Sequence, residues 1–90
     1  MLQPVYTKQF SKDIKKANKR GKNLDKFKII AQTLPGGNEL DELHRDHKLS
    51  GNYIGRRECH IESDWLLIYK CEGEQLIFER TGAHSDLFKK

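Results

Sequence analysis

The chain has 90 residues, 33% of them charged and 36% hydrophobic, and its 17 Lys+Arg against 13 Asp+Glu give a net charge of +4. A chain of this length holds one small core, so we expect a single domain over residues 1–90 and exclude a large enclosed active-site cavity. The longest apolar run, Trp65–Tyr69, is far shorter than the roughly 18 residues of a membrane span, and the N-terminus lacks the basic and apolar regions of a signal peptide, so we expect a cytoplasmic protein with no membrane partner.

The first third of the sequence has the period of amphipathic helices. Apolar residues recur at i, i+4 and i+7 among the lysines, which predicts a helix over residues 8–20 with Thr7 as its N-cap. A second pattern from Leu24 to Leu34, with Asn23 as its cap, predicts a second helix. Two helices joined by a short turn form an antiparallel hairpin. Glu39 to His44 are expected to add a further helical turn.

The second half of the sequence has the pattern of β-strands. Residues 56–62 alternate, residues 65–71 are nearly all apolar as in a central strand covered on both faces, and residues 75–81 follow a turn. We expect Val5–Tyr6 to add a short strand and residues 85–88 a final helical turn. The predicted fold class is α+β, with the helical hairpin packed on one face of an antiparallel sheet of about four strands.

Histidines and arginines in the C-terminal half carry the main functional signal. A pair of imidazoles can supply a base and an acid near neutral pH, and an arginine can neutralise a phosphate without losing its proton. Cleavage of RNA needs these groups, to remove the 2′-hydroxyl proton, to protonate the departing 5′-oxygen and to stabilise charge at phosphorus. The residues are His44, His47, His60 and His84 with Arg56, Arg57, Arg80, Glu58 and Asp64.

Each histidine also has a structural interpretation. His60 could be a solvated sheet residue and His84 a loop residue that caps the last short helix, and both His44 and His47 could be exposed helix-end residues. For His44 we favour the structural interpretation.

A zinc site is the second chemistry that these residue types allow. His44, His47, Cys59 and His60 are all metal-competent, but no ligand-pair motif is present, and Cys59 and His60 are adjacent on a predicted strand and face opposite sides. Cys59 and Cys71 are too few for a disulfide framework. We therefore expect no metal and no other cofactor.

The N-terminal helix is strongly basic. Residues 1–30 hold nine basic and two acidic side chains, a local balance of 9 − 2 = +7. This pattern fits a solvated outer face as well as it fits a platform for nucleic acid phosphates. The candidate phosphate contacts are Lys12, Lys15, Lys16 and Lys19.

Three stretches of sequence resemble the YafQ branch of the RelE/ParE superfamily, the RelE-type toxins of bacterial type II toxin-antitoxin modules. They are residues 46–51 (DHKLSG), 57–69 (RECHIESDWLLIY) and 78–88 (FERTGAHSDLF). The likeness extends from about Phe10 to Phe88. It implies the RelE-like fold, which agrees with the helical hairpin and strand meander expected from the pattern.

The resemblance implies a ribosome-dependent mRNA interferase, a metal-free endoribonuclease that cuts the mRNA codon in the ribosomal A site. Its implied partners are the 70S ribosome, whose ribosomal RNA would meet the basic helix, the mRNA, and a cognate antitoxin. It further implies site residues at the positions of His47, His60, Asp64, Arg80 and His84, with Phe88 contacting the substrate.

Joined with the chemistry above, the resemblance gives a working scheme. His60 and His47 activate the 2′-hydroxyl, Asp64 orients a neighbouring histidine, Arg80 stabilises the phosphorane and His84 protonates the leaving oxygen. Glu58 is expected to contact substrate, although close members of the family carry aspartate there.

Three other functions compete with this scheme. A non-catalytic basic module could bind RNA or protein without turnover, and a ParE-like toxin of the same fold could inhibit DNA gyrase. The histidine set weighs against both. A ribonuclease acting on free RNA is less expected, because so small a chain shows no evident substrate groove.

Overall fold

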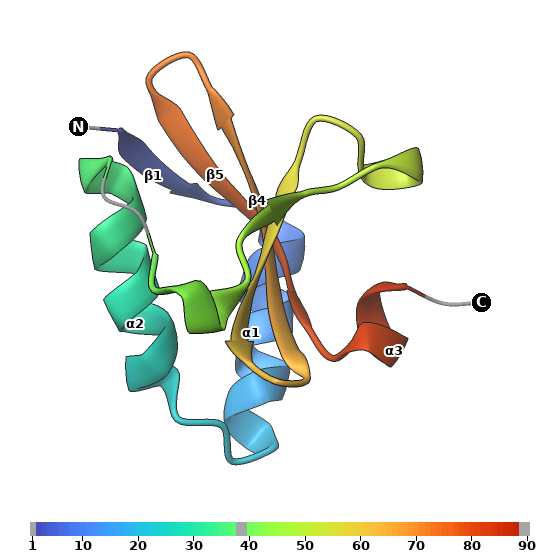
Figure 1. Ribbon diagram of the computed structural model, residues 1–90. Coiled ribbons are helices and arrows are strands. Elements are labelled where there is room, and N and C mark those ends of the chain that lie inside the picture. The colour runs from blue at the N-terminus through green and yellow to red at the C-terminus, as the bar shows by residue number, and fades with distance from the viewer. Residues whose placement is uncertain (1, 38–39, 89–90) are drawn as a thin grey trace.

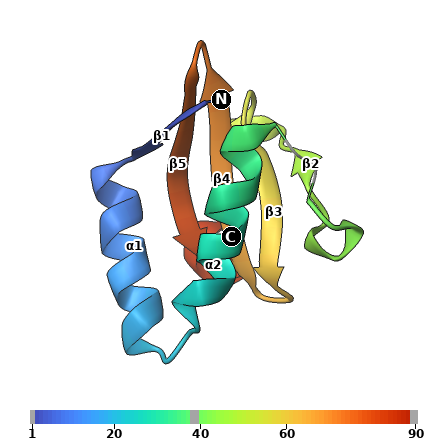
Figure 2. The same cartoon turned by 90° about the vertical axis from the view of Figure 1, so that its left-hand side faces the viewer.

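The computed structural model describes residues 2–37 and 40–88. Within these residues two helices cover one face of a five-stranded sheet, which has the strand order β1-β5-β4-β3-β2 (Figure 1, Figure 2). The strands are β1 (Gln3–Tyr6), β2 (His47–Lys48), β3 (Arg57–Glu62), β4 (Trp65–Glu72) and β5 (Gln75–Gly82). The helices are α1 (Lys8–Lys19), α2 (Leu24–Thr33) and α3 (His84–Leu87), with 3-10 turns η1 (Leu34–Gly36), η2 (Glu42–His44) and η3 (Gly51–Tyr53).

The predicted α+β class, the helical hairpin and the β3-β4-β5 meander are confirmed. Thr7 caps α1 by accepting from the amide of Phe10, and Asn23 caps α2 by accepting from the amide of Asp25. The helical turn expected from Glu39 to His44 is present as η2, while Glu39 itself lies outside the described residues.

The sheet differs from the prediction in two ways. It is mixed, because β1 pairs in parallel with β5, from Gln3 opposite Gln75 to Tyr6 opposite Phe78. It also gains β2, which pairs His47 with Glu58 and Lys48 with Arg57. Both residues of β2 are exposed, so the strand has no apolar alternation that a sequence could show.

The core lies between the sheet and the two helices. Phe10, Phe27 and Phe78 pack ring against ring, with centroids 5.3 to 5.8 Å apart. Further buried residues on this side are Ala17, Ile30, Cys59, Ile61, Trp65, Leu67, Tyr69 and Leu76. This burial raises the pKa of the Cys59 thiol.

The opposite face of the sheet is only partly covered. Leu66 and Ile68 of β4 are fully buried there beneath Leu87 of α3. Leu49, Tyr53 and Phe88 pack around this small cluster. Within the described residues no long helix crosses this face (Figure 1), and His60 of β3 and Arg80 of β5 beside the cluster are partly exposed.

Helix α3 is anchored to α1 by one carboxylate. Asp86 accepts from the amide of Ala83 at 3.0 Å, and its carboxylate pairs with Arg20 at 2.8 Å and with Lys16 at 3.4 Å. The Arg20 hydrogen bond, followed by the Ala83 amide, holds the pKa of Asp86 well below its usual range. These contacts fix the direction in which α3 leaves β5.

No helix in the described part of the chain has the length and apolarity needed to cross a membrane.

Candidate active site

Strand register aligns the predicted site residues on the open face of the sheet. His47, Glu58, Ile68 and Arg80 are neighbours in one row across β2, β3, β4 and β5. His60, Leu66 and Gly82 form the next row. Since neighbours in a row point to the same face, the sheet itself brings together residues 47, 58, 60 and 80.

Two irregularities in the ladder flank these rows. The register shifts between Ile68 and Tyr69 where β4 meets β5, leaving Glu79 as the extra residue, and again between His60 and Glu62. A bulge redirects the side chains next to it. Arg80 and His60 therefore stand beside the two places where the strands bend.

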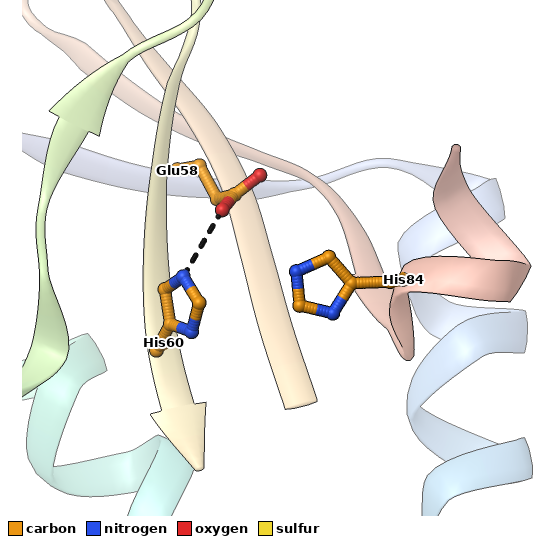
Figure 3. A group of neighbouring side chains, drawn as sticks. All are labelled: Glu58, His60 and His84. Carbon is orange, nitrogen blue, oxygen red and sulfur yellow. Dashed lines mark ion pairs between the residues drawn. The ribbon is translucent and has the colours of Figure 1, made fainter. Parts of the chain in front are cut away.

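Glu58 is the buried centre of the site. It is 5% exposed, and its Oε1 lies 3.2 Å from His60 Nε2 and 3.7 Å from His47 Nε2 (Figure 3). The His47 and His60 rings are 6.4 Å apart between centroids. One carboxylate thus lies within ion-pairing distance of two imidazoles, nearer to that of His60.

His84 enters the site from α3 and is oriented by Asp64. Asp64 Oδ1 accepts from both the backbone amide of His84 at 3.0 Å and its Nδ1 at 2.6 Å. The same two hydrogen bonds, the backbone one first, lower the pKa of Asp64. An Nδ1–H that donates to Asp64 leaves Nε2 for the site, and Figure 3 shows the ring directed toward Glu58 and His60. The His60 and His84 centroids are 5.8 Å apart.

His44 and His47 are held by backbone carbonyls. His44 Nδ1 donates to His60 O at 2.7 Å, and His47 Nδ1 donates to Arg45 O at 2.6 Å. Arg45 has a left-handed φ of 48°, which turns its carbonyl toward His47. His44 is half-buried and bound to the strand that carries His60, so it is not the exposed helix-end residue that the structural interpretation described. His47 presents Nε2 to Glu58.

Arg80 is bound by a residue that sequence reasoning missed. Asp13 of α1 accepts from Arg80 Nε at 2.7 Å and from Nη2 at 3.3 Å, which raises the pKa of the arginine. The sequence does contain a signal, because Asp13 is the one acid between residues 8 and 20. The other two candidate arginines are engaged elsewhere, Arg56 with Glu79 and Arg57 with Asp46.

Phe88 lies at the rim of the site. Its ring is 6.4 Å from that of His84 and makes an edge contact with Tyr53 at 5.5 Å. Tyr53 in turn donates to the Leu87 carbonyl at 3.4 Å. The aromatic ring is thus held next to His84.

The four candidate lysines lie outside this cluster, on α1. Lys12, Lys15 and Lys19 are exposed and make no ion pair within residues 2–37 and 40–88, whereas Lys16 pairs with Asp86. Lys12 and Lys16 line a groove of about 770 Å³ that also borders Arg80 and Asp64. The groove therefore joins the basic helix to two of the predicted site residues, Arg80 and Asp64.

Within residues 2–37 and 40–88, Glu58, His60 and His84 form a metal-competent group that was not expected from the sequence. The ligand atoms of Glu58, His60 and His84 all lie within 4.8 Å of one another. Cys59, which was considered as a ligand, is buried in the helix-side core and points away from them.

The topology and this open-face cluster define the class, a RelE-like toxin. The family model described as "Bacterial toxin of type II toxin-antitoxin system, YafQ" matches residues 2–89, and the chain belongs to that family. Family membership confirms the resemblance stated from the sequence.

Relatives of known structure agree with this assignment. The chain is 46% identical to mRNA interferase toxin YafQ of Escherichia coli K12 over 88 residues, which cover 92% of this chain and 91% of the relative. It matches YafQ in the crystal structure of the E. coli DinJ-YafQ complex with a TM-score of 0.89 and 42% identity, over 98% and 99% of the two chains. It also matches a copper-bound mutant toxin from Helicobacter pylori with a TM-score of 0.94 and 36% identity, over 98% and 100%.

Proposed function

We propose that the chain is an mRNA interferase, an endoribonuclease toxin that cuts mRNA in the ribosomal A site by metal-free acid-base chemistry and is inhibited by a cognate antitoxin. The E. coli relative at 46% identity is named an mRNA interferase. The observation that carries the proposal is the pairing of two imidazoles with two carboxylates on one surface, His60 with Glu58 and His84 with Asp64.

The two pairs suit opposite proton transfers. The Glu58 charge 3.2 Å from His60 Nε2 favours a proton on that nitrogen, which would leave Nδ1 of His60 as the acceptor for the 2′-hydroxyl proton. His47 Nε2, 3.7 Å from the same carboxylate, would be a second acceptor. Asp64 accepts from Nδ1–H of His84, so in the doubly protonated imidazolium the Nε2–H is directed into the site and is the donor to the departing 5′-oxygen. Arg80 stabilises charge on the phosphorus oxygens.

Attack of the 2′-oxygen on phosphorus forms a 2′,3′-cyclic phosphate and releases a 5′-hydroxyl. The proton removed from the 2′-hydroxyl and the proton given to the 5′-oxygen balance, so the step consumes neither metal nor water. The ribosome would supply the substrate geometry that an open sheet face lacks. Phe88, whose ring is next to His84, would contact a nucleotide base.

Cleavage of an mRNA positioned on a programmed 70S ribosome, beside the same RNA free in solution, tests the proposal. We expect cutting only on the ribosome, in the A-site codon, with a 2′,3′-cyclic phosphate or 3′-phosphate and a 5′-hydroxyl at the new ends. Lack of cutting in both, by folded protein free of antitoxin, would overturn it and make gyrase inhibition the next activity to assay.

The unpaired lysines of α1 are proposed to bind ribosomal RNA. Lys12→Gln, Lys15→Gln and Lys19→Gln together should weaken ribosome binding and reduce the slope of log affinity against log salt by about three, one for each lost phosphate contact. Cleavage at saturating ribosome should be unchanged. Lys70→Gln, which removes a β4 lysine paired with Glu72, is the control. Equal affinity of the triple variant at low salt would refute the role.

A cognate antitoxin is proposed as the protein partner, since a YafQ relative is solved in complex with DinJ. Inhibition requires that the antitoxin cover the histidine cluster or the basic helix, or displace a residue of the site. Ribosome and antitoxin should therefore compete for the toxin.

Transition metals are expected to inhibit the enzyme. Cu²⁺ or Zn²⁺ held by Glu58, His60 and His84 would occupy the nitrogen lone pairs that proton transfer needs, and a toxin relative is described as copper-bound. Toxin loaded with one equivalent of Cu²⁺, freed of excess metal, should lose cleavage and recover it with a chelator. Mg²⁺, which prefers oxygen ligands, should not inhibit. Full activity of the copper-loaded toxin would contradict this.

A further inference from the structure

A buried carboxylate on the lysine-rich helix reaches the arginine of the proposed site. Asp13 is 8% exposed, although its neighbours along α1 are mostly solvated lysines. Burial of an unpaired carboxylate is costly, and the cost is offset only by good partners. Asp13 has them on both oxygens, and its main partner is Arg80.

The place of Asp13 follows from a gap in the sheet. β1 pairs with β5 from Gln75 to Phe78, so among the described residues no strand borders the last residues of β5 on that side. At this point α1 lies beside β5, and the amide of Thr81 donates to Asp13 Oδ2 at 3.2 Å. Gln9, one turn earlier on α1, donates to Oδ1 at 3.0 Å.

Asp13 therefore accepts four hydrogen bonds, two from Arg80 and one each from Thr81 and Gln9. A carboxylate has about four acceptor positions, so none is left for a competing donor. The backbone amide fixes the carboxylate to β5, and the carboxylate fixes the guanidinium.

The hydrogen bonds to Asp13 determine which nitrogen of Arg80 can bind a substrate. Its guanidinium is a rigid planar fork, so binding Nε and Nη2 to Asp13 sets the direction of Nη1. The side of the guanidinium that does not bind Asp13 lies near the Tyr53 hydroxyl, which adds to the raised pKa of Arg80, and the side chain is 28% exposed. One side of the guanidinium therefore binds α1, and the other side faces Tyr53 and solvent, from which an anion can approach.

We propose that Asp13 is a positioning residue, which orients the Arg80 guanidinium so that Nη1 meets the phosphate undergoing cleavage. This inference rests on the proposed function. It makes α1 part of the catalytic apparatus, because the helix that carries the ribosome-binding lysines also sets the phosphate contact. A carboxylate that served only to join α1 to β5 would affect stability and leave the cleavage rate of folded protein unchanged.

A double-mutant cycle separates these two roles. In single-turnover cleavage on saturating programmed ribosomes, Asp13→Asn should slow the reaction by about tenfold or more, and Arg80→Ala by about a hundredfold. The ribosome concentration at half-saturation should stay the same. Asp13→Asn added to Arg80→Ala should cause no further loss, since the residue acts only through the arginine.

Glu79→Gln is the matched control, because it breaks an arginine–carboxylate pair on the adjacent residue of β5 without touching Arg80. It should cleave at the wild-type rate. Where Asp13→Asn is too unstable for the assay, Asp13→Glu carries the same test, since it keeps the ion pair and displaces the guanidinium by one methylene.

The Nε–H resonance of Arg80 in ¹⁵N NMR spectra of the free toxin gives a readout that needs no activity. In the wild type it should be shifted and protected from exchange, and in Asp13→Asn both properties should be lost. Absence of wild-type cleavage would defeat the proposed function while this signal still reports the hold on Arg80. Wild-type cleavage by Asp13→Asn, an equal slowing by it in the Arg80→Ala background, or an unprotected wild-type signal would each overturn the inference.

Discussion

His84→Asn is expected to lower single-turnover cleavage on the ribosome by about 10² or more, the usual scale of a general acid's contribution. The amide nitrogen of asparagine takes the place of Nδ1, so the hydrogen bond to Asp64 and the position of α3 are kept. What is lost is Nε2, the atom directed toward Glu58 and His60 (Figure 3). Binding to ribosome and antitoxin should stay near the wild-type level.

His44→Asn is the matched control for this change. It too keeps an Nδ1-type donor, here to the His60 carbonyl, and removes an Nε2 to which the scheme gives no role. We expect its cleavage rate to stay within about tenfold of the wild type. Equal rates for the two variants would remove His84 from the chemistry, and a large loss in both would point to disturbed packing instead.

The parts of the fold that depend on apolar period could be predicted, and those that depend on pairing partners could not. The spacing of Phe10 and Ala17 predicts α1, and the apolar run from Trp65 predicts a central strand. The parallel pairing of β1 with β5 was missed because the residues of a strand do not show which other strand it pairs with. β2 was missed because two exposed residues carry no alternation.

The site shows the same division. Its histidines, Asp64 and Arg80 could be selected by residue type and by family likeness, since imidazoles and a guanidinium suit phosphodiester cleavage. Their arrangement could not, because Glu58 and Arg80 share a row only through the register of three strands and the bulge at Glu79. Asp13 was missed for a related reason: its partner is 67 residues away in the sequence.

Substitution of Glu58 is expected to lower the cleavage rate without lowering the stability of the fold. Glu58→Gln should lower cleavage by about 10², because the amide carries no charge to hold a proton on His60 Nε2 as the 2′-hydroxyl is deprotonated. The folded protein should be at least as stable, since the change removes a carboxylate that is 5% exposed and carries a desolvation cost. Glu58→Asp, which keeps the charge on a shorter arm, should retain most of the activity.

Glu62→Gln on the same strand should lower the stability of the fold and leave the cleavage rate unchanged. Glu62 pairs with Lys22 at 3.1 Å and Lys26 at 2.8 Å, and the Lys26 hydrogen bond, followed by that of Lys22, lowers its pKa. A carboxyl with a lowered folded-state pKa stabilises the fold above its unfolded value, near 4.3, and loses that contribution as pH falls through the folded value. Glu62→Gln should therefore cost under about 1 kcal/mol of unfolding free energy at pH 7 and nothing well below pH 4, with unchanged cleavage.

Denaturant unfolding across this pH range, beside cleavage assays at pH 7, checks both variants. Crossed outcomes, with activity lost only in Glu58→Gln and stability lost only in Glu62→Gln, would show that β3 carries a catalytic carboxylate and a structural one four residues apart. If Glu58→Gln unfolds more readily than the wild type at pH 7, then Glu58 contributes to the core, and the scheme loses the group that orients His60. Burial of the Glu58 carboxylate is expected to raise the cleavage rate and to lower the free energy of unfolding. The cleavage assay measures the first effect and denaturant unfolding measures the second.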